Sequence, residues 1–249
     1  MTQWRWNLLL DAEPHPGALN MAIDAALLAE ADRTGASLLR LYRWNPPCLS
    51  LGRNEPALAR YDRGAIQRRG LAVVRRPTGG RAVWHEHEVT YAVAAPTLPF
   101  GSLRESYRAI HQRLARALQA LGARVELATG RAVPLRTPGA CFAQPAGGEV
   151  LVGGRKVIGS AQVRQGGALL QHGSILLAGS QEMVQAVSRQ PSGVNGATTL
   201  SAALGRPVPF AEVVQAIVET WGNPLTPFAP ALSRVAPSRF SDPSWTWRR

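Results

Sequence analysis

The sequence predicts an α/β (α+β) fold in which helices flank a mixed β-sheet. Apolar residues recur at helical spacing along residues 16–35, 102–122 and 208–222. Short strand-like runs alternate irregularly with these segments, which favours a mixed sheet over a purely parallel one. The chain has 249 residues, of which 45% are hydrophobic, so it is long enough to build one large core.

The N-terminal third begins with a predicted strand at residues 4–10 and a predicted helix at residues 16–35. Leu19, Ile23 and Leu27 share one face of that helix, and Gly35 can end it. A turn at 45–47, rich in proline, separates the next two strands. The patterns to residue 96 predict strands at 38–44 and 48–52, a helix at 56–70, and strands at 71–77 and 89–96.

Residues 102–122 carry the clearest helical pattern in the chain. Ser102 is a suitable N-cap and Gly122 a suitable end. His111 lies beside the apolar stripe, and we interpret it as a partly buried packing residue rather than a catalytic one. The stripe consists of Leu103, Tyr107, Ile110, Leu114, Leu118 and Leu121.

Strands and glycine-rich turns are expected between residues 124 and 179. Within them, residues 148–163 predict two strands joined at Gly153-Gly154, which is a hairpin signal. A further helix is predicted at 208–222.

We expect one domain, because no internal repeat and no linker interrupts the chain. This domain covers residues 1–222, with its core at about 33–222. A proline-rich tail follows at 223–249, and we expect it to be irregular. Trp245 and Trp247 would pin the tail to the body.

The formal net charge of +12 predicts an acidic partner. The arginines are dispersed and no aromatic-basic motif is present, so charge alone supports a nucleic-acid-binding protein, the weakest alternative. No apolar run is long enough for a membrane span or a secretory signal. Cys48 and Cys141 lie far apart, so we expect free thiols and a cytoplasmic location.

Lys156 is the only lysine in a chain that otherwise uses arginine. Cys141 lies 15 positions before it and His172 lies 16 positions after it. A nearby cation lowers the pKa of a thiol, and a histidine within reach can transfer a proton. This spacing is compatible with a cysteine nucleophile, although a free cysteine such as Cys48 is more often a small buried apolar residue.

Residues 73–91 combine a strand, two arginines and a Gly-Gly turn. Such a turn can bind an anion, with Arg75 and Arg76 adding charge-assisted hydrogen bonds, or it can be only a turn. His85 and His87 would share one face of a strand, but no third metal ligand is evident, so we expect no metal.

Several motifs together resemble the biotin/lipoate protein ligase superfamily, which includes lipoate-protein ligases and octanoyltransferases. They are "ALNMAIDAALL", "RWNPPCLSLGRNE", "RRPTGGRAVWHEHEVTYAV", "GGRKVIGSAQVR" and "LQHGSILL". "RRPTGGRAV", with Arg81 after the two glycines, and "GACF", which contains Cys141, are most similar to the cysteine-dependent octanoyltransferase branch. The resemblance implies the catalytic fold shared with class II synthetases.

Carried over by motif, the resemblance implies that Cys141 is the nucleophile and that Lys156 lowers its pKa and holds the acyl carbonyl. "FAQPAGGEV" after Cys141 departs from the family pattern, which usually has an acidic residue after the phenylalanine. The substrate-binding residues it implies are Arg75, Arg76, Gly79, Gly80, Arg81, Ala82, His85, Gly159, Ser160, Gln162, His172 and Gly173.

The activity implied is transfer of an octanoyl group from octanoyl-acyl carrier protein, through a cysteine thioester, to a lysine of a lipoyl-type domain such as the glycine cleavage H protein. It needs no cofactor, no nucleic acid and no membrane. One alternative is an ATP-dependent lipoate-protein ligase, which would need ATP and Mg²⁺. Another is acyl transfer between two lipoyl domains.

Overall fold

The computed structural model describes residues 5–129, 147–191, 196–222, 224–230 and 235–248. Within these ranges a central mixed sheet forms the middle layer of the molecule. Its three antiparallel pairings and two parallel pairings join the strands in the spatial order β10 (Ile158–Gln165), β11 (Ala168–Leu176), β6 (Glu88–Pro96), β2 (Ser37–Tyr42), β1 (Trp6–Leu10) and β12 (Leu225–Pro227).

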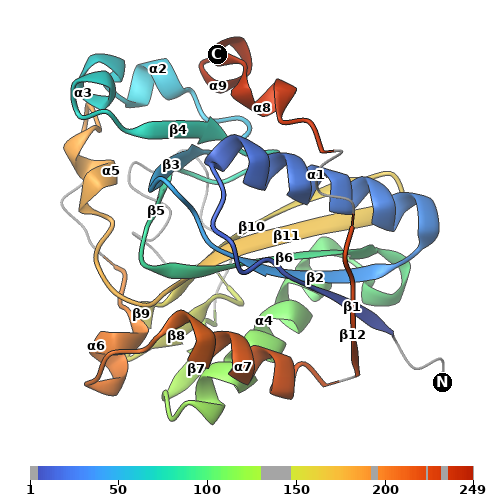
Figure 1. Ribbon diagram of the computed structural model, residues 1–249. Coiled ribbons are helices and arrows are strands. Elements are labelled where there is room, and N and C mark those ends of the chain that lie inside the picture. The colour runs from blue at the N-terminus through green and yellow to red at the C-terminus, as the bar shows by residue number, and fades with distance from the viewer. Residues whose placement is uncertain (1–4, 130–146, 192–195, 223, 231–234, 249) are drawn as a thin grey trace.

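Helices cover both faces of the central sheet (Figure 1). Helix α1 (Gly17–Thr34) packs across one face, mainly over β6 and β11. Helices α4 (Leu103–Ala120) and α7 (Phe210–Thr220) pack together on the opposite face. The fold is therefore a mixed α/β sandwich, as the sequence predicts.

Alternation along the strands separates two apolar cores. In β6, Ala92 and Ala94 face α1, whereas Tyr91 and Val93 face α4 and α7. Both faces are buried, so the strand is a nearly continuous apolar run.

Two three-stranded sheets flank the central one, and short helices connect them. They are β4 (Ala72–Arg75), β3 (Cys48–Leu51) and β5 (Val83–His85), and the antiparallel β7 (Val125–Leu127), β8 (Val150–Val152) and β9 (Arg155–Lys156). The short helices are α2 (Ala57–Arg60), α3 (Arg63–Arg68), α5 (Glu182–Ala186), α6 (Leu200–Leu204) and a 3₁₀ turn at Leu98–Phe100.

The sequence predicted helix ends and turns correctly where a single residue determines them. Ser102 and Glu105 form a reciprocal capping box at the start of α4. Gly35 ends α1 with φ of 72°, and its N–H donates to Ala31 O at 2.9 Å. Gly153 and Gly154 make the β8–β9 turn with φ of 57° and 71°.

Two predicted elements, the hairpin at 148–163 and the helix at 56–70, are each split into two elements in the structure. The strand after the Gly-Gly turn leaves its sheet beyond Lys156 and continues as β10 in the central sheet. The helix breaks at Tyr61, which pairs with Ser188 in an extended bridge, while the Asp62 side chain caps the following helix. Tertiary pairing overrides helical spacing here.

The expectation of an irregular tail was wrong in part. Strand β12 adds to the central sheet beside β1, and two short helices, α8 (Ser238–Ser241) and α9 (Pro243–Thr246), pack near β4 and α1 (Figure 1). The expected anchoring was confirmed for Trp245, whose Nε1 donates to Arg75 O at 2.9 Å.

Arg75 holds the tail from the other side. Its buried guanidinium donates to the carbonyls of Gly52 (2.7 Å) and Glu55 (2.9 Å) in the loop after β3. It also donates to the carbonyls of Thr246 (2.9 Å) and Arg248 (3.1 Å). One side chain thus cross-links two segments that are distant in sequence.

None of the described helices has the length and apolarity needed to cross a membrane.

Replacing Arg75 with alanine should lower the free energy of unfolding by about 3 kcal/mol, because several buried carbonyl groups lose their donor together. Urea unfolding followed by circular dichroism measures this. Arg69→Ala is the control, since Arg69 is exposed and should change stability by less than about 0.5 kcal/mol. Equal stability of the two variants would contradict the role given to Arg75.

Candidate active site

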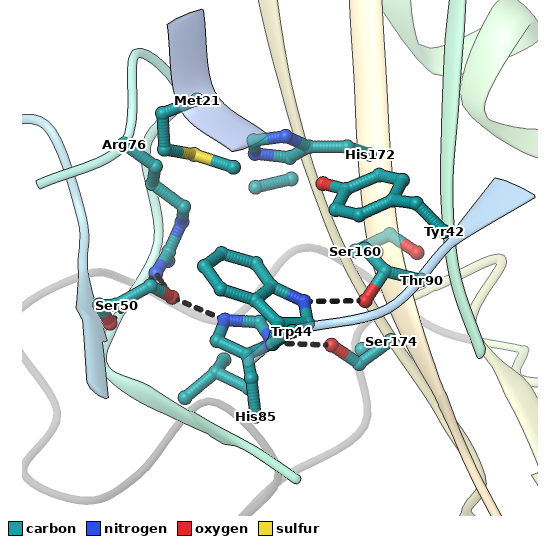
Figure 2. Close-up of a pocket in the computed structure, with 14 residues that line it drawn as sticks. Met21, Tyr42, Trp44, Ser50, Arg76, His85, Thr90, Ser160, His172 and Ser174 are labelled. Atoms are coloured by element: carbon teal, nitrogen blue, oxygen red, sulfur yellow. Dashed lines mark hydrogen bonds between the residues drawn. The ribbon is translucent and has the colours of Figure 1, made fainter. Parts of the chain in front are cut away.

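A pocket lies between α1, the β4–β3–β5 sheet and strands β6, β10 and β11 (Figure 2). Its walls are mainly apolar and aromatic, with a few polar groups. The residues that line it are Met21, Tyr42, Trp44, Ser50, Arg76, Val83, His85, Thr90, Gly159, Ser160, Ala161, His172, Gly173 and Ser174.

His172, on β11, forms part of the wall with both ring nitrogens bonded. Nδ1 donates to Asp24 Oδ2 at 2.8 Å, and Nε2 lies 2.6 Å from the hydroxyl of Thr78. Burial lowers the pKa of His172 more than its hydrogen bond with Asp24 raises it, which keeps the ring neutral near pH 7. Nε2 of the neutral ring accepts from Thr78.

His85, at the end of β5, is held in the same manner. Nδ1 donates to Glu88 Oε1 at 2.8 Å, and Nε2 lies 2.6 Å from the hydroxyl of Ser50. The ring stacks on Trp44 with centroids 4.0 Å apart and an angle of 13° between the planes, and Ser174 Oγ lies 3.1 Å from the same Nδ1 (Figure 2). The ring is therefore fixed in position and orientation.

The predicted pair His85 and His87 does not share a face, because β5 ends at His85. His85 is buried, whereas the His87 side chain is 61% exposed. Among the described residues, no group of three His, Cys, Asp or Glu side chains is arranged to hold a metal ion.

Arg76 organises the glycine turn beside the pocket. Its guanidinium donates to Gly79 O at 2.9 Å, to Arg81 O at 2.6 Å and to Ser50 O at 3.0 Å. The following Ala82 is fully buried and packs in the β4–β3–β5 layer. Arg76 thus reaches both the turn and the pocket wall.

The turn needs glycine because another backbone segment packs against it. Gly80 has φ of +87°, and a Cβ atom on Gly52 would lie 1.9 Å from Gly80 O. Neither position accepts a side chain without displacing the loop. A Cβ atom on Gly79, by contrast, would meet no atom within 4 Å.

Strands β10 and β11 supply the pocket floor. Gly159, Ser160 and Gly173 line it, and a Cβ atom on Gly173 would lie 2.5 Å from both Gly159 O and Ser160 Oγ. The floor therefore depends on a close backbone approach at Gly173.

Two residues implied as substrate-binding point elsewhere in the described part of the chain. Arg75 contacts the loop after β3 and the tail, as described above, because neighbouring strand residues point in opposite directions. Gln162 lies on the α4 side of β10, with its amide within hydrogen-bond distance of Ser106 and Gln171.

Lys156 is buried on the α4 side and does not line the pocket described here. Its Nζ donates to Glu149 Oε1 at 2.5 Å. Cys141, the implied nucleophile, lies outside the described residues. Cys48 is buried as expected, and burial raises the pKa of its thiol to about 12.

His111 connects the pocket with the neighbourhood of Lys156, and its full burial exceeds the partial burial that we expected. Nδ1 donates to Gly148 O at 2.7 Å, and Nε2 lies 2.8 Å from the hydroxyl of Ser160, which lines the pocket. Burial, with a smaller contribution from the charge of Lys156, lowers the pKa of His111 to about 4. The helical pattern could not predict this burial, because the polar partners of His111 come from segments distant in the sequence.

The pocket brings together six of the residues implied by the motifs and adds others that the motifs did not indicate. The six are Arg76, His85, Gly159, Ser160, His172 and Gly173. Among those missed, Tyr42 and Thr90 belong to apolar strands, where only the alternation of faces marks them. Those missed are Met21, Tyr42, Trp44, Ser50, Val83, Thr90, Ala161 and Ser174.

Chemically, the pocket combines an apolar interior with two imidazole rings and one guanidinium group at its walls. This composition suits a short aliphatic chain that ends in a polar carbonyl.

Residues 16–222 match the family model described as the lipoyl protein ligase A/B catalytic domain. The chain is 43% identical to octanoyltransferase LipM of Moorella thermoacetica over 196 residues, covering 76% of this chain and 70% of the relative. It is 39% identical to octanoyltransferase LipM of Symbiobacterium thermophilum, covering 90% and 87%. With octanoyltransferase LipM of Brevibacillus brevis the identity is 33% over the whole of both chains.

Solved structures share the fold at lower identity. A lipoate-protein ligase A bound with ATP superposes with a TM-score of 0.81 at 21% identity, covering 99% of each chain. A bipartite lipoate protein ligase from Thermoplasma acidophilum gives 0.74 at 20% identity, covering 98% of this chain and 96% of the other.

Replacing His111 with asparagine should remove a pH-dependent part of stability. The folded pKa of about 4 lies below the ordinary 6.5, so the unfolded chain binds more protons between these values. The stability that His111 contributes is complete above pH 6.5 and is lost as pH falls toward 4, by about 3 kcal/mol. Unfolding free energies of wild type and variant between pH 4 and 7 measure this; a constant difference would contradict it.

Proposed function

Because the chain belongs to the lipoyl protein ligase A/B catalytic-domain family, we propose that it is an octanoyltransferase of lipoate biosynthesis. The observation that carries this conclusion is the 33–43% identity to octanoyltransferases over most of both chains. The enzyme is an acyltransferase that attaches an octanoyl group to a protein.

The pocket supports this activity through its chemistry. Met21, Tyr42 and Trp44 contribute apolar walls, which are typical of sites for small apolar ligands. An eight-carbon chain has no polar atoms beyond its carbonyl, so walls of this kind can bury it without leaving a donor or acceptor unpaired.

The reaction proceeds in two acyl transfers, a thioester exchange followed by aminolysis of the new thioester. The thiolate of Cys141 attacks the carbonyl carbon of octanoyl-acyl carrier protein; a C–S bond to Cys141 forms, and the carrier thiol leaves. A lysine amine of a lipoyl-type domain, such as the glycine cleavage H protein, then attacks this thioester. The amide forms, the amine loses a proton, and Cys141 is released as a thiol.

Lys156 assists Cys141 through its charge. A nearby ammonium favours the thiolate and can donate to the acyl carbonyl as negative charge develops on oxygen. Glu149 fixes the ammonium at 2.5 Å in a buried setting, which orients it. The slender lysine suits this place, whereas a guanidinium occupies more space.

No cofactor is required in this scheme, because the thioester supplies the free energy for amide formation. Free thiols suit a reducing compartment, which agrees with catalysis in the cytoplasm.

Cys141→Ala should abolish covalent octanoylation, with a rate loss of at least about a thousandfold. Intact-protein mass spectrometry after mixing with octanoyl-acyl carrier protein, without ATP, detects the adduct. Cys48→Ala is the matched control and should retain it, because Cys48 is buried with a raised pKa. Transfer that requires ATP and free fatty acid would instead establish a ligase and reduce Cys141 to a bystander.

Lys156→Arg should lower the rate of adduct formation about a hundredfold or more although the positive charge is kept, because the guanidinium cannot occupy the ammonium's position beside Glu149. Single-turnover kinetics at several pH values measure this, with thermal unfolding as a check on the fold. Arg155→Lys is the control on the same strand, since Arg155 is exposed at the β8–β9 turn and a lysine ammonium can keep the hydrogen bond that its guanidinium donates to Ala197 O. A rate equal to wild type in Lys156→Arg would contradict the claim that position 156 requires a lysine.

A further inference from the structure

Three arginines gather where the C-terminal helices meet the loop after β3. The guanidinium carbon of Arg239 lies 3.6 Å from the ring centroid of Trp245, and that of Arg248 lies 3.7 Å from the same centroid. Arg248 also donates to the backbone carbonyl of Arg53 at 2.5 Å. Arg53, Arg239 and Arg248 together are called the arginine cluster below.

The cluster has positive charge with no ion-pair partner within the described ranges. Burial and the repulsion of neighbouring arginines lower the pKa of both Arg239 and Arg248. The one acidic residue in the sequence of the tail, Asp242, accepts instead from the N–H and hydroxyl of Ser244, at 2.7 Å each. Like charges held together on a surface favour an anionic partner that would offset them.

The cluster is coupled to the pocket through the glycine turn. The N–H of Arg53 donates to Thr78 O at 2.8 Å, and the Thr78 hydroxyl lies 2.6 Å from His172 in the pocket wall. The preceding Gly52 packs directly on Gly80. A partner bound at the cluster would therefore lie against the loop that borders the pocket.

We propose that the arginine cluster is the docking surface for the acidic carrier protein that delivers the octanoyl group; this inference rests on the proposed function. The carrier's prosthetic arm contains a phosphodiester, and guanidinium groups match phosphate geometry with paired hydrogen bonds. The acceptor lysine of a lipoyl-type domain, by contrast, carries no phosphate. The phosphodiester thus favours the donor over the acceptor.

Reversing two charges in Arg53→Glu/Arg239→Glu should weaken binding of octanoyl-acyl carrier protein about tenfold at low ionic strength. Fluorescence anisotropy of labelled carrier measures the Kd without requiring turnover. Added salt should narrow the difference, since it screens exposed charges. Circular dichroism and thermal unfolding verify that each variant is folded.

Arg116→Glu/Arg124→Glu is the matched control, because it makes the same change in net charge at two exposed residues. Arg116 is on α4 and Arg124 precedes β7, on the side of the sheet opposite α8 (Figure 1). The Kd of this control variant for the carrier should stay within about twofold of the wild-type value. Both enzymes should keep the wild-type KM for octanoyl-pantetheine, a donor without the acidic protein.

Equal weakening in the control pair would overturn the proposal, and so would weaker binding of the lipoyl acceptor with unchanged binding of the carrier. Loss of DNA affinity alone would overturn it as well. A wild-type enzyme that binds the carrier through the cluster but transfers no octanoyl group from either donor would contradict the proposed function and leave the docking surface supported.

Discussion

A buried guanidinium organises the centre of the molecule. Arg40, on β2, has no exposed surface and donates to Asp11 at 2.6 Å, to Asp24 at 2.8 Å and to Asn20 at 2.7 Å. These partners come from the end of β1 and from α1, so one cation fixes the helix on the sheet. A buried charge that loses its partner costs about 3–5 kcal/mol, which makes this geometry strongly specified.

Asp24 extends that constraint into the pocket. Burial alone would raise its pKa, but the hydrogen bond from His172 and the charge of Arg40 outweigh burial and lower it. Both pocket histidines follow one pattern: a buried carboxylate holds Nδ1 and a hydroxyl contacts Nε2. The pairs are Asp24 with Thr78, and Glu88 with Ser50. Rings held at both nitrogens keep their orientation before any substrate arrives.

The sequence was informative wherever a single residue decides local structure. Ser102 and Gly35 marked helix ends correctly because capping is a local interaction, and the motif glycines and histidines of the pocket were identified by resemblance. The sequence was uninformative where contacts with distant segments determine the local structure. Tyr42 reaches the pocket, and Tyr61 leaves its helix, through pairings with residues far away in the chain. Arg75 and Arg76 look equivalent in sequence, yet strand alternation sends only one of them to the pocket.

The parallel pairing of β12 with β1 extends the folded unit beyond the region that the family model matches. The family match ends at residue 222, but the next strand, Leu225–Pro227, completes the edge of the central sheet. Farther on, Thr246 and Arg248 accept hydrogen bonds from the buried Arg75. A chain that stopped at residue 222 would therefore leave β1 with an unpaired side at the sheet edge, and it would leave the buried Arg75 guanidinium without two of its acceptors.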